Sequence, residues 1–239
     1  MINIISTFYL SKYNSELDSS RTKELENTLL KNIDSVYIEK IHLFVDDYDA
    51  LEKLNCITNY SNKISIIEIG KKPKYKDFFK YINENLKDKL CMITNADIYL
   101  HECDINLLDL LNSNKQVYGL TRYEHDLSHP LIDNYGGSHD SYIFNSKYLN
   151  NIDLENEDIN FYQNYPGIES HILRFFNTMN FKLLNPCYQI KIVHLHETNL
   201  RNHGPWIGLH NCGDFDFHMK TCWWVPPIML NQEFYLKDF

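Results

Sequence analysis

The sequence predicts an α/β fold in which helices cover both faces of a mostly parallel central sheet. Short runs of β-branched and aromatic residues alternate with segments in which apolar residues recur at helical spacing. The first 100 residues therefore read β-α-β-α-β-α-β. Strands joined by helices in this way pair in parallel. The chain of 239 residues is 44% hydrophobic, and no Pro/Gly/Ser linker or charge block divides it, so we expect one domain with a sizeable core.

The first half of the chain supplies most of this sheet. The first strand is expected at residues 2–9, and the first helix at residues 19–33, where Leu25, Leu29 and Leu30 share one face. Further strands are expected at residues 38–45 and 63–69 and from residue 90 onward, with helices at 49–54 and 75–86.

The second half contains shorter elements and a long polar segment. Helices are expected at residues 107–111 and 168–179, and strands at 116–120, 140–145 and 189–196. Residues 124–138 are expected to form a loop that is long enough for a lid or an acceptor loop.

The end of the chain, residues 204–239, is rich in aromatic residues and is treated as a tail on a domain of residues 1–203. It contains Trp206, Trp223 and Trp224. Such a tail suits a sugar-stacking surface, a lid, a contact in a homodimer, or a cover over the core.

Composition excludes several classes of partner. A net charge of −9 argues against non-specific binding of nucleic acid, which needs a basic face. No apolar run approaches the roughly 20 residues that span a bilayer, and the first ten residues do not resemble a signal peptide. The six cysteines show no CxxC spacing, so we expect a reduced, cytoplasmic protein.

Acidic residues follow two of the expected strands. Asp97 lies just beyond the strand that begins at Leu90, and Asp46 follows the second strand. Ligands of open α/β sheets collect at the carboxyl ends of strands, and Asp is a hard oxygen ligand for Mg²⁺ or Mn²⁺. The alternative for Asp97 is that it caps a following helix.

The first strand and helix offer contacts for a nucleotide. Ser6 and Thr7 lie near the end of the strand, where backbone and hydroxyl groups could meet it. Arg21 lies in the first turn of the helix, where a cation is unfavourable. A ligand-binding role would explain this position, and an exposed arginine is the alternative.

Two histidines recur near the end of the domain. His194 and His196 are two residues apart, so both imidazoles project from the same face of an extended chain. Imidazoles in this arrangement bind metal ions or contact phosphate. Buried single histidines are usually structural, but Arg201 and His203 follow closely here.

The order and spacing of several short motifs resemble those of small GT-A-type glycosyltransferases, found in bacterial and large-virus sugar-coat clusters. The resemblance covers residues 2–203. Its motifs are TNADI at 94–98, LTR at 120–122, SHDSYIF at 138–144, YPGIES at 165–170 and HLHETNLRNH at 194–203. The first acid of the family's DxD motif is Asn95 here, so Asp97 is its only carboxylate.

This resemblance implies a GT-A-like, Rossmann-type sheet and transfer of a sugar from a nucleoside-diphosphate sugar to a glycan or glycoprotein hydroxyl. It implies that Mn²⁺ or Mg²⁺ is held by Asp97 and one of His194 and His196, with the other His and Arg201 near the diphosphate. Asn95 would bind the ribose. The residues assigned to the nucleotide sugar are Ser6, Thr7, Arg21, Asp46, Asn95, Arg122 and Arg201.

An inverting transfer needs a carboxylate that removes the acceptor's proton. Asp140, at the start of a strand, and Glu169, in the first turn of a helix, are the candidates, with a slight preference for Asp140. For Glu169 the alternative is a favourable contact with the helix dipole. Retaining chemistry, which shows no such base, stays open.

Three other functions compete with this one. A sugar-nucleotide nucleotidyltransferase would show a glycine-rich loop after the first strand, but residues 7–21 contain no glycine. A non-catalytic sugar-binding or assembly protein is favoured by Asn95 and by the aromatic tail. A metallohydrolase built on the HxH motif lacks a further His/Asp cluster to complete its site.

Overall fold

The computed structural model describes residues 1–12, 16–58, 61–127, 139–163, 168–198, 225 and 227–230. Its strands are β1 (Ile2–Thr7), β2 (Ile38–Val45), β3 (Ile64–Glu68), β4 (Leu90–Thr94), β5 (Ile98–Cys103), β6 (Gln116–Thr121), β7 (His139–Asn145), β8 (Lys182–Leu184) and β9 (Ile190–His194). Its helices are α1 (Asp18–Asp34), α2 (Tyr48–Thr58), α3 (Tyr75–Asn85), α4 (Ile105–Ser113) and α5 (Ile168–Thr178), with 3-10 turns η1 (Ser146–Tyr148) and η2 (Glu157–Ile159).

A seven-stranded sheet in the order β3-β2-β1-β4-β7-β6-β8 forms the centre of the described part of the chain. β1 pairs in parallel with both β2 and β4. At the two ends of the sheet, β3 pairs in parallel with β2, and β8 pairs in parallel with β6. β7 is antiparallel to both β4 and β6. The fold is therefore α/β with a mostly parallel sheet, as predicted.

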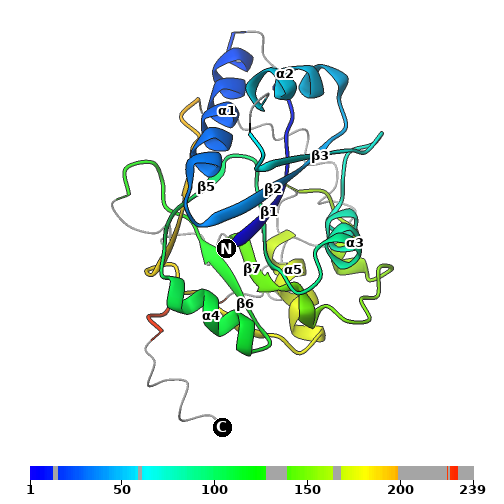
Figure 1. Ribbon diagram of the computed structural model, residues 1–239, viewed down its shortest axis with the longest axis vertical. Helices are drawn as coiled ribbons and strands as arrows, with labels where there is room; N and C mark the ends of the chain where they lie inside the picture. Colours follow the sequence, from blue (N-terminus) through cyan, green and yellow to red (C-terminus); the bar gives the residue numbers. More distant parts are fainter. Residues whose placement is uncertain are drawn as a thin grey trace, which may run out of the picture.

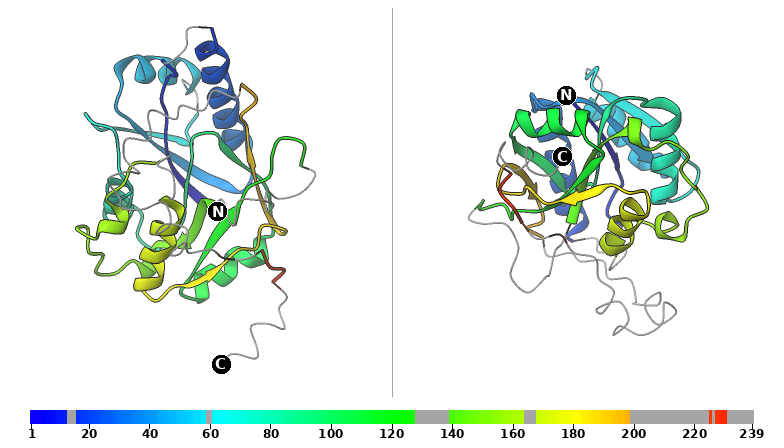
Figure 2. Two further views of the ribbon diagram at one scale, coloured as in Figure 1. Left: turned by 180° about the vertical axis from the view of Figure 1, so that it is seen from behind. Right: turned by 90° about the horizontal axis from the view of Figure 1, so that it is seen from below.

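Helices pack on both faces of this sheet (Figure 2). Successive side chains of a strand point to opposite faces, so Ile4 joins one core cluster and Ile5 joins the other. The first cluster contains apolar residues of α1, α2 and α4. The second contains those of α3 and α5, among them the fully buried Phe79 and Phe176.

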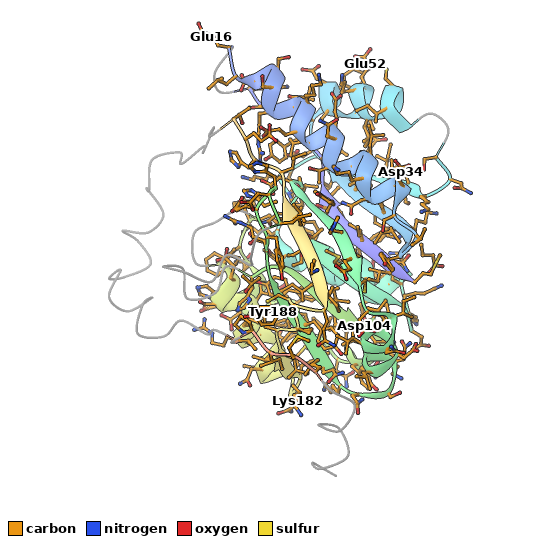
Figure 3. All side chains as sticks on the ribbon, turned by 90° about the vertical axis from the view of Figure 1, so that its left-hand side faces the viewer. Glu16, Asp34, Glu52, Asp104, Lys182 and Tyr188 are labelled. Carbon is orange, nitrogen blue, oxygen red and sulfur yellow. The ribbon has the colours of Figure 1, made fainter. Side chains whose placement is uncertain are left out.

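A small antiparallel sheet of β5 and β9 lies on the first face, beneath α1. Figure 3 shows α1 running from near Glu16 to Asp34 over this pair of strands. The side chain of Asn32 fastens the helix to the strand: its Nδ2 donates to the carbonyl of Ile98 at 3.0 Å, and its Oδ1 accepts from the backbone of Leu100 at 3.0 Å. This attachment fixes the end of β5 that follows Asp97.

Two strands were not predicted, β5 and β8. Because β5 begins at Ile98, Asp97 precedes a strand, and the suggestion that it caps a helix is wrong. The exposed pair at positions 101 and 102 interrupts the apolar pattern of β5. β8 has only three residues, too few to show a period. Most of the loop predicted at 124–138, residues 128–138, lies outside the described residues.

The described residues of the C-terminal tail contact the domain (Figure 1). The fully buried Asn185 donates from Nδ2 to the carbonyl of Val225 at 3.0 Å, and its own carbonyl accepts from the backbone of Ile228 at 3.0 Å. Gln189 exchanges two hydrogen bonds with the backbone of Leu230. The three tryptophans of the tail lie outside the described residues.

Among the described helices, none combines the length and apolar character that crossing a membrane would require.

Candidate functional site

The candidate site lies where β1 and β4 end at the carboxyl edge of the sheet. The buried Ser6 hydroxyl donates to the carbonyl of Thr94 at 2.8 Å, and Gln163 donates to the same carbonyl at 2.9 Å. Thr7 donates in turn to Gln163 at 3.3 Å. These bonds hold the end of β4 immediately before Asn95 and the turn that carries Asp97.

Three predicted metal ligands meet at this turn. The Oδ2 atom of Asp97 lies 3.1 Å from Nε2 of His194 and 3.9 Å from Nδ1 of His196. One ligand atom from each residue lies within 4.8 Å of the other two. The backbone explains the convergence, because Ile98 pairs with His194 across the small sheet and the backbone N–H of Leu195 donates to the carbonyl of Asp97 at 2.9 Å.

Arg21 and Glu24 of α1 connect the helix to this cluster. Arg21 is buried, and its Nη2 lies 2.5 Å from Oδ2 of Asp97. Its Nη1 donates to Glu24 at 2.8 Å and to the carbonyl of Leu195 at 3.2 Å. Glu24 also accepts the backbone N–H groups of Glu197 and Thr198. The pair thus attaches the segment after β9 to α1, and the guanidinium of Arg21 faces the cluster rather than solvent.

A second acid, Glu124, contacts His194 from the other side. Its Oε2 lies 3.3 Å from Nδ1 of His194, and its Oε1 accepts from Arg122 at 3.1 Å. The hydrogen bond from His194 lowers the pKa of Glu124 to about 2. Burial lowers the pKa of His194, but hydrogen bonds to Asp97 and Glu124 outweigh this and raise it to about 9. Without a metal ion, His194 is therefore a cation between two carboxylates at neutral pH.

His196 has a different environment from His194. Burial, together with the charges of Arg21 and His194, lowers its pKa to about 4, so its ring is neutral. Its Nε2 is buried and has no hydrogen-bond partner in the part of the chain that the structure describes. Buried polar atoms of this kind are uncommon in native proteins and call for a ligand or a water. Because the ring is neutral, one of its nitrogens carries no proton and can coordinate a metal ion, and Nδ1 is the nitrogen that lies 3.9 Å from Oδ2 of Asp97.

The donor set fits a divalent metal ion. Although burial opposes ionisation, the hydrogen bond and charge of His194 and the charge of Arg21 hold the pKa of Asp97 far below its usual range, so the carboxylate is ionised. One carboxylate with two imidazoles suits Mn²⁺ and later first-row metals better than Mg²⁺, which prefers oxygen ligands. Arg21 is the feature that opposes the ion, because its charge already neutralises Oδ2 of Asp97.

The two candidate bases lie beyond Asn95. Nδ2 of Asn95 donates to Oδ1 of Asp140 at 3.2 Å, and Nη1 of Arg122 lies 3.2 Å from each oxygen of that carboxylate. Glu169 is partly buried in the first turn of α5. Burial, followed by the charge of Asp140, raises its pKa to about 7. The two carboxylates therefore interact electrostatically, and Asp140 is the one that is paired with an arginine.

The remaining predicted residues lie in different places. Asp46 is exposed at the end of β2, and within the described residues it does not join the network around Asp97. Arg201 lies outside the described residues. The sequence reasoning missed Glu24, Glu124 and Gln163. For Glu24 a signal existed, because residues three apart on a helix are neighbours and Arg21 precedes it by three.

No family model matches the sequence, and no curated protein matches it. Solved structures that align with the chain include S. aureus TarS residues 1–349, at 11% identity and a TM-score of 0.48 over 81% of this chain. The chain spans 60% of the length of that TarS fragment.

Two further alignments are of similar quality. A protein of Desulfovibrio desulfuricans G20, described provisionally as a nucleotide-diphospho-sugar transferase, aligns at 10% identity and a TM-score of 0.43, covering 77% of this chain and 78% of the other. The 4-diphosphocytidyl-2C-methyl-D-erythritol synthase of Anaerococcus prevotii aligns at 14% identity and 0.44, covering 77% and 86%. The identities and TM-scores of these alignments are too low to indicate a function.

Proposed function

We propose that the protein is a metal-dependent glycosyltransferase that moves a sugar from a nucleoside-diphosphate sugar to a hydroxyl of a glycan or glycoprotein. The observation that carries this proposal is the convergence of Asp97, His194 and His196 at the carboxyl edge of the sheet. Ligands of open α/β sheets bind at this edge. A hard carboxylate and a neutral imidazole, whose Nε2 has no hydrogen-bond partner among the described residues, together suit a cation that accompanies phosphate.

The departing nucleoside diphosphate sets the chemical requirement. Its developing negative charge must be neutralised, which is what a bound Mn²⁺ or Mg²⁺ supplies. Asp97, His194 and His196 would hold that ion. Arg21 orients Asp97 through their ion pair. Its hydrogen bond to the carbonyl of Leu195 holds the segment that carries the histidines. We therefore assign Arg21 to positioning, in place of the nucleotide contact expected from the sequence.

The nucleotide sugar would lie against the ends of β1, β2 and β4. We assign its contacts to the edge residues Ser6, Thr7, Asp46, Asn95 and Arg122, with Arg201 as a further candidate near the diphosphate. Of these, Asn95 and Arg122 are held in place by Asp140. An amide at position 95 can hydrogen-bond a ribose hydroxyl, as the carboxylate of the family's motif does.

The base in an inverting reaction must accept a proton near neutral pH. We propose Glu169 for this role, because a pKa near 7 balances ionisation against basicity. Asp140 was slightly preferred from the sequence, but both of its oxygens accept from Arg122. The Asp140–Arg122 pair would then position the donor, while the charge of Asp140 helps burial to raise the pKa of Glu169 and the charge of Arg122 opposes this.

Two observations favour a second function, a sugar- or nucleotide-binding protein without catalysis. The cation of Arg21 already occupies Oδ2 of Asp97, and Asn95 replaces an acid. Such a protein would bind nucleotides without needing a metal. A nucleotidyltransferase is disfavoured by the lack of glycine in residues 7–21. Cytoplasmic location and a homodimer stay predictions.

The test is thermal stability against a panel of nucleoside diphosphates, with and without Mn²⁺. A ligand that binds the native state raises the melting temperature by mass action. We expect a metal-dependent shift with one nucleotide, lost in Asp97→Asn and kept in Asp104→Asn, whose carboxylate caps α4 away from the site. A shift in melting temperature that is the same with and without Mn²⁺ would favour the non-catalytic binding protein. No shift with any nucleotide would contradict the transferase.

A further inference from the structure

The connection between β3 and α3 concentrates positive charge in an acidic chain. Residues 71–80 contain five of the 23 lysines and arginines, whereas the net charge of the chain is −9. In Figure 1 this connection descends along the right-hand edge of the molecule into α3. Because it follows the carboxyl end of β3, it lies at the same edge of the sheet as the candidate site. The proposed transferase chemistry does not use it.

Two of these lysines gather over one aromatic ring. The Nζ atoms of Lys72 and Lys74 lie 5.3 Å and 5.1 Å from the ring centroid of Tyr162, whose side chain is 40% exposed. Lys71, by contrast, pairs with Asp77 at 3.2 Å. Among the described residues, no carboxylate pairs with Lys72 or Lys74, although Nζ of Lys74 donates to Oδ1 of Asn160 at 3.0 Å. Each of these ammonium groups would attract an anion that approaches the ring of Tyr162.

The backbone ties this group to the candidate site. Lys74 and Tyr162 form an antiparallel bridge, and the backbone N–H of Tyr75 donates to the carbonyl of Phe161 at 3.0 Å. The residue after Tyr162 is Gln163, which donates to Thr94 at the end of β4. Tyr75 is buried, and burial with the charges of Glu169 and Asp140 raises its pKa. Lys74 and Tyr162 therefore each lie one residue from a side chain, Tyr75 or Gln163, that belongs to the surroundings of the candidate site.

We propose that Lys72, Lys74 and Tyr162 form an acceptor lip, a subsite that binds a glycan acceptor carrying carboxylate or phosphate groups. An exposed tyrosine ring supplies an apolar face on which a sugar can stack, with a hydroxyl at its edge. The two ammonium groups supply point charges for an acidic substituent. The role of this subsite in acceptor binding rests on the proposed transferase function, whereas its binding of an acidic glycan does not.

Binding of defined oligomers to the full-length protein tests the acceptor lip. The probes are a galacturonate pentamer, a glycerol-phosphate pentamer, and the neutral methyl ester of the first, titrated by calorimetry at low and moderate salt. We expect at least one acidic oligomer to bind, at least about tenfold more tightly than the ester, and more weakly as salt screens the charges. The better of the two acidic oligomers identifies carboxylate or phosphate as the group recognised.

Variants locate the binding. Lys72→Ala/Lys74→Ala should weaken it at least about tenfold, whereas Lys23→Ala/Lys87→Ala, an equal loss of charge at exposed lysines on α1 and beyond α3, should leave it unchanged. Tyr162→Ala should weaken it and Tyr162→Phe, which keeps the ring, should not. Equal binding of the ester, equal effects of the two lysine pairs, or failure of both acidic oligomers to bind would overturn the acceptor lip.

The outcome is separable from that of the nucleotide panel. Oligomer binding that depends on Lys72 and Lys74, without a shift in melting temperature for any nucleotide, would support the acceptor lip and contradict the transferase function. A metal-dependent nucleotide shift without oligomer binding would do the reverse.

Discussion

Arg21 and Asp97 form a buried ion pair in which Nη2 of the arginine lies 2.5 Å from Oδ2 of the aspartate. The pair joins α1 to the turn between β4 and β5, 76 residues apart in the chain. The same oxygen of Asp97 also faces His194 and His196. Arg21 therefore holds the carboxylate in place and, at the same time, competes for the charge that a metal ion would use.

Replacing Arg21 by Met should separate these two effects. Removal of one partner from a buried pair leaves the other charge uncompensated, so the free energy of unfolding without metal should fall by about 3 kcal/mol. Affinity for Mn²⁺ should rise, because no guanidinium competes for Asp97. Calorimetric titration with Mn²⁺ and urea denaturation measure the two quantities.

Arg174→Met is the matched control for that variant, since Arg174 pairs with Asp158 away from the cluster. Its affinity for Mn²⁺ should equal that of the wild type. If Arg21→Met bound Mn²⁺ more weakly than the wild type, Arg21 would organise the ligands without competing with the ion.

His194 and His196 should differ when each is replaced by Ala. His194 contacts both Asp97 and Glu124, so His194→Ala should lower both stability and Mn²⁺ affinity. His196→Ala removes a ring whose Nε2 has no partner among the described residues, so stability without metal should change little. Its Mn²⁺ affinity should still fall at least about tenfold, a loss that even outer-shell changes cause. Unchanged Mn²⁺ affinity in His196→Ala would remove this residue from the proposed ligand set.

The sequence predicted the main sheet well, because its strands are buried apolar runs with clear ends. Expected and observed bounds agree at residues 38–45, and they differ by a few residues for most other elements. β5 was not predicted because its partner β9 lies 87 to 96 residues away in the paired positions and because β5 has two exposed residues in its pattern. Long-range pairing of this kind leaves little local signal.

The site was predictable in part. Asp97, His194 and His196 stand out by residue type and spacing, and the structure brings them together. The roles of Arg21, Glu24 and Glu124 depend on which side chains face one another across α1, β9 and the segment after β6. An arginine in the first turn of a helix reads the same whether it faces a ligand or an internal carboxylate, so only the fold distinguishes the two.

Asn185 should control the attachment of the C-terminal tail. Its side chain contacts Thr121 through a backbone N–H and a hydroxyl, and Val225 through a carbonyl. Asn185→Ala leaves these groups unpaired in a buried place and should cost about 3 kcal/mol of unfolding free energy. Limited proteolysis should then cut between residues 224 and 239 faster than in the wild type. Asn177→Ala, at an exposed position of α5, is the control, and equal proteolysis of the two variants would contradict the role of Asn185.

Glu169 should make stability and activity depend on pH in opposite directions. Its pKa in the folded protein is about 7, above the ordinary value of 4.5, so the folded state binds more protons than the unfolded state between these values. Stability should therefore fall as pH rises from about 4.5 to 7, by up to about 3 kcal/mol. Glu169→Gln should remove this fall and be more stable than the wild type above pH 7.

Activity tests the proposed role of Glu169 as base. If ionised Glu169 accepts the proton of the acceptor, turnover should rise through pH 7 in the wild type and be lost in Glu169→Gln, while metal-dependent nucleotide binding persists. Asp140→Asn removes the charge that raises the pKa of Glu169, so the rise in turnover should move to lower pH. A Glu169→Gln enzyme that keeps its rate and its pH profile would return the role of base to Asp140 or point to retaining chemistry.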